Sequence, residues 1–157
     1  MAPVTFIFIP ASVTASGPDC AASPEGPGAA PSWPLSSHLA LEAVDSAVPT
    51  ARHHARRVVL EWRLTALADT TELLVSELVT NAIYASREAR SAAVRLWLSA
   101  DANCVVIHVW DASDRIPARR LADARAECGR GLLLVESLSR DWGSYRAARG
   151  KVVWAML

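Results

Sequence analysis

Glu77 and Asn81 are the two polar residues whose spacing first suggests chemistry. They lie four residues apart in SELVTNAIYAS (76–86), a segment that is otherwise mostly small or apolar. Four residues are about one turn, so both side chains project from the same face of any helix formed here. A carboxylate can polarise a water or a hydroxyl, and the amide oxygen beside it can bind a hard cation such as Mg²⁺. Solvated residues on an amphipathic helix would give the same pattern, so the pair alone leaves both interpretations open.

Asp111 is a second candidate, at the end of the alternating stretch VVIHVW. It continues the face formed by Val105, Ile107 and Val109, at the point where the strand should stop. An Asp here could simply begin a turn, which is common. A carboxylate at the rim of a sheet can also accept a hydrogen bond from an exocyclic amine, such as the N6 amine of adenine. Ser113, two residues further on, could hold a bridging water.

The tripeptide GRG at 129–131 is a third candidate, because it opens a helical pattern with Leu132, Val135 and Leu138 on one side. The unpaired N–H groups and the positive dipole end of a helix N-terminus favour phosphate. Glycines also let the backbone approach an anion closely. One G-x-G is weak evidence by itself. The chain has no G-x-x-x-x-G-K-[ST] segment, which excludes the P-loop class.

Alternation, helical periodicity and turn residues predict the elements that must position these groups. Asp69, with Glu72 three residues later, is typical of a capping box at the start of a helix. The irregular segment 112–128 contains a short predicted helix around PARRLADA (117–124). The main predicted elements are a strand at 33–43, a helix after Pro49, a helix from Asp69 to about Ser86, a hairpin of 94–99 and 105–111, a helix after 129–131, and strands at about 142–147 and 151–157.

This order predicts an α+β fold, a two-layer sandwich in which helices cover one face of a mixed, mainly antiparallel sheet. Hairpin connections bring consecutive strands together, and the helices come from separate parts of the sequence. A doubly wound nucleotide fold needs regular βαβ alternation, which the chain lacks.

Composition limits the classes of function. The chain has 157 residues, 52% of them hydrophobic, which is enough for one domain with its own core. Its net charge is zero, so we expect no nucleic-acid partner. Three widely spaced cysteines without a C-x-x-C pair argue against a disulfide framework and against a zinc site.

The N-terminal part differs from the rest. Residues 11–31 contain seven Gly or Pro in 21 positions and little that could pack, so we expect a disordered tail at 1–32 and one domain at 33–157. The first residues, MAPVTFIFIPA, are apolar but too short and lack the basic residues of a signal peptide. No run reaches the roughly 18 apolar residues of a membrane span, so we expect a cytoplasmic protein without a membrane partner.

Four segments together resemble one family, the GHKL ATPases with the Bergerat fold, and the likeness covers about residues 33–157. ELVTNAI is similar to the N box of that family, and DASDRIP to its first glycine-box variant. GRGLLLVESLSRDWG resembles the second glycine box, and GKVVWAML the closing strand. Within the family, the chain is most similar to the small bacterial serine kinases that act as anti-sigma factors.

The resemblance implies a nucleotide site for ATP and Mg²⁺. Asn81 would coordinate Mg²⁺, and Glu77 would be the general base for an attacking hydroxyl or water. Residues 114–128 would form a mobile lid over the nucleotide. The nucleotide-binding residues that the resemblance implies are Asn81 (Mg²⁺), Asp111 (adenine N6), Ser113 (through water), and Gly129, Arg130 and Gly131 (phosphates).

The resemblance also implies a function. The expected activity is that of a serine/threonine protein kinase that phosphorylates an antagonist protein and sequesters a sigma factor. Such kinases usually form homodimers. The alternative is a non-catalytic module that binds ATP and a partner protein but transfers nothing.

Two residues depart from the family pattern. Ala85 stands where the family often has a His, four residues after Asn81. Val152 stands at a position usually occupied by a Thr whose hydroxyl helps to hold water near the adenine. Lys151, beside it, lies in a predicted hairpin, where we expect a solvated side chain rather than a catalytic one.

Overall fold

The computed structural model describes residues 33–115 and 130–157. The predicted tail at 1–32, the predicted helix around 117–124, most of the predicted lid and Gly129 lie outside the described residues. Arg130 is described only as part of a helix, without its side chain.

The described residues form the predicted succession of strands and helices, with one additional 3₁₀ turn. The elements are β1 (Leu35–Glu42), α1 (Ala47–Glu61), η1 (Thr65–Leu67), α2 (Ala68–Glu88), β2 (Ala93–Ala100), β3 (Val105–Asp111), α3 (Arg130–Leu138), β4 (Asp141–Arg146) and β5 (Lys151–Met156).

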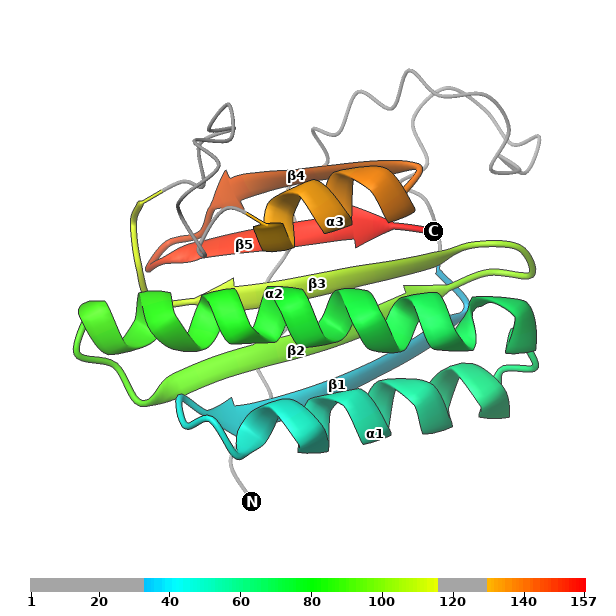
Figure 1. Ribbon diagram of the computed structural model, residues 1–157, viewed down its shortest axis with the longest axis horizontal. Coiled ribbons are helices and arrows are strands. Elements are labelled where there is room, and N and C mark those ends of the chain that lie inside the picture. Colours follow the sequence, from blue (N-terminus) through cyan, green and yellow to red (C-terminus); the bar gives the residue numbers. More distant parts are fainter. Residues whose placement is uncertain (1–32, 116–129) are drawn as a thin grey trace. The chain divides into compact units, whose positions relative to one another are not determined.

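The strands form one five-stranded sheet in the order β1-β2-β3-β5-β4. Each strand pair among the described residues is antiparallel, whereas the prediction allowed for some parallel pairing. Figure 1 shows the three α-helices on one face of this sheet, with α2 running across its centre. The α+β two-layer sandwich is therefore confirmed.

The core lies between the sheet and the helices. Alternate residues of β2 and β3, such as Leu96 and Ile107, are fully buried on the helix side. From α2, the side chains of Leu74, Val79 and Ile83 are buried against them. Burial of each such side chain is worth roughly 1.5–3 kcal/mol. This packing fixes the rotation of α2, and it leaves Glu77 half-buried and Asn81 exposed.

The predicted capping box at Asp69 and Glu72 is wrong. Helix α2 begins at Ala68, and its N-cap residue makes no side-chain hydrogen bond. Both carboxylates instead bind arginines of α1. Arg52 Nη2 lies 3.1 Å from Glu72 Oε1, Arg56 Nη1 lies 3.1 Å from Glu72 Oε2, and Arg56 also binds Asp69. These partly exposed pairs tie α1 to α2 with at most about 1 kcal/mol each.

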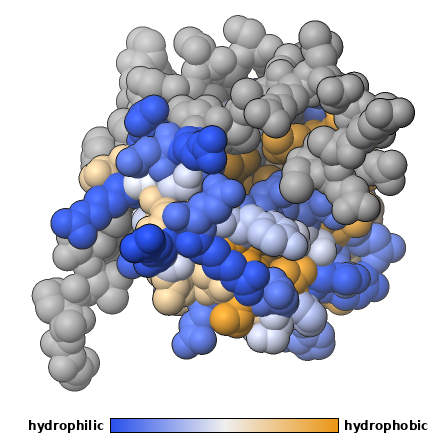
Figure 2. All heavy atoms as spheres, turned by 60° about the vertical axis from the view of Figure 1, so that its left-hand side comes forward, coloured by the Kyte–Doolittle hydropathy of each residue, from blue (hydrophilic) through white to orange (hydrophobic). Residues whose placement is uncertain are grey.

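The surface of the described residues is mainly hydrophilic where Figure 2 views it, with smaller apolar areas between the charged side chains. Of the helices in the described ranges, none combines the length and the apolar character that crossing a membrane requires.

Candidate functional site

Glu77 and Asn81 meet the start of α3. A Cβ atom placed on Gly131 would lie only 2.6 Å from Glu77 Oε2 and 3.5 Å from Asn81 Nδ2. The first distance is shorter than real Cβ contacts, so a residue with a side chain at 131 would force Glu77 to move. The structure therefore brings three of the sequence-predicted residues together, and it gives a packing reason for the glycine.

The first turn of α3 faces this polar side of α2. Arg130 is the first helical residue, so Gly131 lies where the helix still has backbone N–H groups without intrahelical partners. These donors and the positive end of the helix dipole lie next to a carboxylate and an amide. The arrangement offers donors for an anion and oxygen ligands for a cation at the same place.

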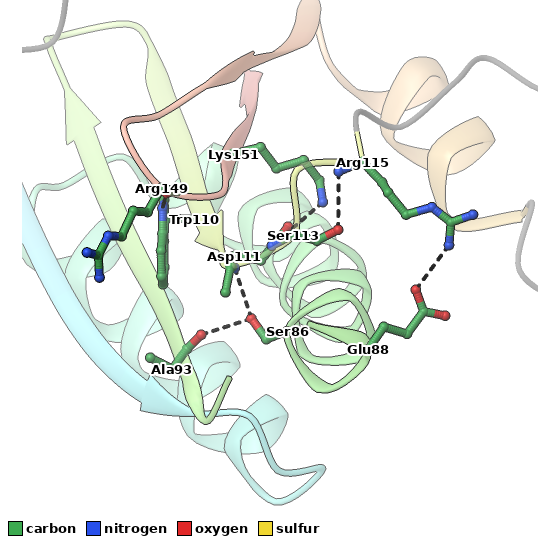
Figure 3. Close-up of polar contacts among 10 residues, drawn as sticks. Ser86, Glu88, Ala93, Trp110, Asp111, Ser113, Arg115, Arg149 and Lys151 are labelled. Atoms are coloured by element: carbon green, nitrogen blue, oxygen red, sulfur yellow. Dashed lines mark hydrogen bonds and ion pairs between the residues drawn. The ribbon is translucent and has the colours of Figure 1, made fainter. Parts of the chain in front are cut away.

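Asp111 ends β3 and is only 2% exposed. Its Oδ1 atom accepts a hydrogen bond from the backbone N–H of Ser113 at 2.9 Å, which closes the turn after the strand. The same oxygen lies 2.8 Å from the ammonium nitrogen of Lys151 (Figure 3). Ser113 is also buried, and its hydroxyl accepts the N–H of Arg115 at 3.2 Å.

The expectation that Lys151 is solvated is wrong, because Lys151 is only 5% exposed. The pairing of β3 with β5 places Lys151 directly across from Asp111. The preceding turn holds Gly150 at φ 74°, and a Cβ there would overlap the carbonyl oxygen of Asp111. Because Lys151 is paired with Asp111, both side chains lie on the face of the sheet that the helices cover, and the lysine is buried there.

The interpretation of Val152 also needs correction. Val152 is paired with Trp110, the residue before Asp111 in β3. Successive side chains of a strand point to opposite faces of the sheet. Val152 therefore lies on the face away from the Asp111 carboxylate. The β5 residue that shares a face with Asp111 is Lys151.

Residues 41–157 match the family model of the histidine kinase-like ATPase domain, which is 117 of the 157 residues. The chain belongs to this family. Membership supports ATP binding and an ATP-binding regulatory role. No curated protein matches the chain significantly.

In this histidine kinase-like ATPase domain, the surroundings of Asp111 have two opposite effects on the pKa of its carboxyl. Burial raises the pKa of the Asp111 carboxyl above its usual range. The hydrogen bond from Lys151, the Ser113 N–H and the lysine charge each pull that pKa back down. Two donors on a single carboxylate oxygen are typical of an acceptor that is kept ionised inside a protein.

Ser86 is a positioning residue that sequence reasoning missed. It is fully buried near the end of α2, where its hydroxyl donates to the Ala93 carbonyl at 2.9 Å and accepts from the Ala112 N–H at 3.2 Å. It thereby joins α2, the start of β2 and the turn after Asp111. The sequence could have indicated this role, because Ser86 lies on the apolar stripe of its helix, at helical spacing from Val79 and Ala82.

A second contact reinforces that junction from outside. Arg115 Nη1 lies 3.4 Å from Glu88 Oε2, and both side chains are largely exposed. The domain thus holds the DASD segment against α2 by one buried hydroxyl and one surface ion pair, as Figure 3 shows.

Proposed function

We propose that this domain is an ATP-dependent serine/threonine protein kinase of anti-sigma-factor type. It phosphorylates an antagonist protein and binds a sigma factor, with homodimerisation as in similar kinases. The main support is the juxtaposition of the Glu77 carboxylate, the Asn81 amide and the start of α3 at Gly131. Family membership supports the ATP-binding part of this proposal.

The residues suit a magnesium–nucleotide complex. The Asn81 side-chain oxygen is a hard ligand of the kind Mg²⁺ accepts, and one protein ligand suffices when phosphate oxygens and water complete the shell. Among the residues that the structure describes, no group of three or more His, Cys, Asp or Glu could replace that arrangement. When bound, Mg²⁺ would offset the charge on the phosphates. The backbone N–H groups at the start of α3, by Gly131, are suited to bind the phosphates, and we propose the same role for Gly129 and Arg130.

We assign recognition of the base to Asp111 and Ser113, and binding of the phosphates and Mg²⁺ to the residues around Gly131. Asp111 accepts the exocyclic N6 amine of adenine, and Ser113 assists through a water. Their positions are fixed by the Ser113 N–H to Asp111 bond and by Ser86, which anchors the following residue.

Glu77 is the proposed general base. Its half-buried carboxylate accepts the proton of the attacking serine hydroxyl while the Gly131 backbone restricts where it can lie. Phosphoryl transfer depends mainly on positioning and on charge neutralisation, so one well-placed carboxylate is enough to act as the base. We also propose that the protein acts in the cytoplasm, and that neither nucleic acid nor a membrane is its partner.

Two observations favour a second function, a non-catalytic module that binds ATP and a partner protein. Ala85 replaces the frequent histidine of the N box, and Lys151 already occupies one oxygen of Asp111. Both features concern the site for the nucleotide rather than the partner surface. A domain with this site could bind ATP as a structural ligand and transfer nothing.

Calorimetric titration with ATP, with and without Mg²⁺, tests the nucleotide site. We expect Mg²⁺-dependent binding in the wild type, loss of the Mg²⁺ dependence in Asn81→Ala, and loss of the preference for ATP over GTP in Asp111→Asn. Failure of the wild type to bind ATP under any condition would contradict both proposed functions.

Transfer of labelled phosphate from ATP to purified candidate antagonist proteins of the same genome separates the two functions. Glu77→Gln should bind ATP normally and lose transfer by a factor of about 10² or more. Glu61→Gln, an exposed glutamate of α1, is the matched control and should retain transfer. ATP binding without transfer to any candidate in the wild type would favour the non-catalytic module.

A further inference from the structure

Lys151 is the one lysine among the sixteen Lys and Arg residues of the chain. It is also buried, at 5% exposure, whereas the arginines of the described segments at positions 52, 56, 57, 95 and 146 are exposed. Lysine carries a compact point charge on an unbranched stem, while the arginine guanidinium is planar and larger. The Lys151 ammonium nitrogen lies 2.8 Å from Asp111 Oδ1, so this compact charge is in direct contact with the carboxylate.

The contact is one-sided. Lys151 Nζ lies 2.8 Å from Asp111 Oδ1, and the Ser113 N–H lies 2.9 Å from the same oxygen. Within the described residues, these are the contacts that orient the carboxylate, and both are made by Oδ1. Among the described residues, Oδ2 makes no hydrogen bond, which leaves this oxygen as an acceptor.

We propose that Lys151 is a positioning residue for base recognition, whose ammonium holds the Asp111 carboxylate ionised and oriented so that the second oxygen accepts the exocyclic amine of the base. This rests on the proposed nucleotide site. It gives the β5 lysine a role in the adenine site, whereas the family resemblance had concerned a water-holding hydroxyl at position 152, where this chain has valine.

The charged groups around this carboxylate are few among the described residues. Asp111 shares a cross-strand row with Leu41, Val94, Lys151 and Arg146, and Arg146 is exposed at the edge strand. From α2, the uncharged Ser86 contacts the residue after Asp111, and the exposed Glu88 binds Arg115. Lys151 is thus the cation in direct contact with the buried carboxylate.

The chemistry requires an ionised acceptor. An amine N–H donates to a carboxylate, but a protonated carboxyl presents its own O–H and loses one acceptor site. Burial alone raises the pKa of Asp111, and Lys151 is the largest influence that lowers it again. Without the lysine, protonation would compete with the base amine at pH values near neutrality, because unpaired buried carboxyls reach pKa values several units above normal.

The test compares ATP with purine riboside triphosphate, which lacks the exocyclic amine, by calorimetry at pH 6 and pH 8. The ratio of the two affinities cancels the titration of the triphosphate itself. In the wild type we expect ATP to be favoured by about tenfold or more at both pH values, the worth of one charge-assisted hydrogen bond. In Lys151→Met the ratio should fall close to one at pH 6 and recover towards pH 8.

Arg149→Met is the matched control, because it also removes one positive charge, two residues before Lys151. The Arg149 side chain is exposed and points away from Asp111 (Figure 3). It should keep the wild-type ratio at both pH values. Thermal unfolding of each variant shows whether it is folded.

The outcomes separate the two proposals. Wild-type protein that binds neither nucleotide contradicts the nucleotide site, and the role of Lys151 with it. A wild type that prefers ATP, together with a folded Lys151→Met that keeps this preference at pH 6, overturns the role of Lys151 alone. If Lys151→Met does not fold, the wild-type series decides: loss of its preference for ATP between pH 8 and pH 6 would overturn the proposal, and a constant preference supports it.

Discussion

At the residue scale, Gly131 determines how closely α3 can approach the carboxylate of Glu77. Gly131→Ala would place a methyl group 2.6 Å from Glu77 Oε2, so the end of that flexible side chain must move. The fold can accommodate this movement, and alanine is the better helix former by about 1 kcal/mol. We therefore expect unchanged or slightly raised thermal stability, with phosphotransfer reduced by roughly 10² because a displacement of about 1 Å suffices for such a loss.

The control for this prediction is a double-mutant cycle. If Gly131→Ala acts through the Glu77 carboxylate, adding it to Glu77→Gln should cost little further activity, because residues that act as a unit are not additive. Equal additional losses in both backgrounds would show that the glycine acts through the phosphates or through the helix itself. Transfer rates and ATP affinities of the four proteins decide between these outcomes.

At the element scale, the junction of α2, β2 and the turn after β3 depends on one hydroxyl. Ser86→Ala would leave the half-buried Ala112 N–H and Ala93 carbonyl without that partner. Each unsatisfied buried group costs about 1–3 kcal/mol, so the free energy of unfolding should fall by roughly 2–4 kcal/mol in urea denaturation. ATP affinity should fall as well, because the turn carries Asp111 and Ser113.

Ser76→Ala is the matched change for this prediction, because it makes the same substitution in the same helix at a half-buried position. It should alter the unfolding free energy by no more than about 0.5 kcal/mol. A similar loss in both variants would mean that the junction is not held by the Ser86 hydroxyl.

The elements themselves were largely predictable because they depend on local patterns. Alternation at Val94, Leu96 and Leu98 fixed which face of the hairpin would be buried, and the structure agrees. Helical spacing did the same for α2, and it placed Glu77 and Asn81 on one face. These signals are properties of adjacent residues, so they need no knowledge of the fold.

Contacts between distant segments were not predictable in the same way. Asp69 and Glu72 have capping-box spacing, yet arginines of α1 bind them, which only the packing of the two helices decides. The burial of Lys151 depends on the register of β5 against β3, and a shift of one residue would have sent it to the opposite face. The partners of Ser86 likewise come from two other segments. The residues of the site could therefore be proposed from sequence, whereas the contacts that hold them could not.

At the scale of the whole molecule, stability should depend on pH through His108, on the sheet face away from the helices. It lies between Trp97 and Trp154 on the neighbouring strands, and its Nδ1 atom is buried without a partner among the described residues. Burial lowers the pKa of His108 from 6.5 to about 4. The folded protein therefore keeps this imidazole neutral where the unfolded chain has already bound a proton.

The sign of the effect follows from this difference. The stabilisation is fully present above pH 6.5 and is lost as the pH falls towards about 4, the pKa in the folded state. The loss should reach roughly 2–3 kcal/mol across that range, since one unit of pKa corresponds to about 1.4 kcal/mol. The raised pKa of Asp111 works in the opposite direction, because its carboxyl binds a proton more readily in the folded state.

Comparison of the wild type with His108→Gln isolates the histidine, since both proteins retain Asp111. Urea denaturation at several pH values between 4 and 7.5 should show a stability that falls more steeply with acid in the wild type than in the variant. The two curves should run parallel above pH 6.5, where His108 is neutral in both the folded and the unfolded states. Parallel curves down to pH 4 would mean that protons reach His108 in the folded sheet as easily as in the unfolded chain. The tryptophans on either side would then not shield the imidazole from water.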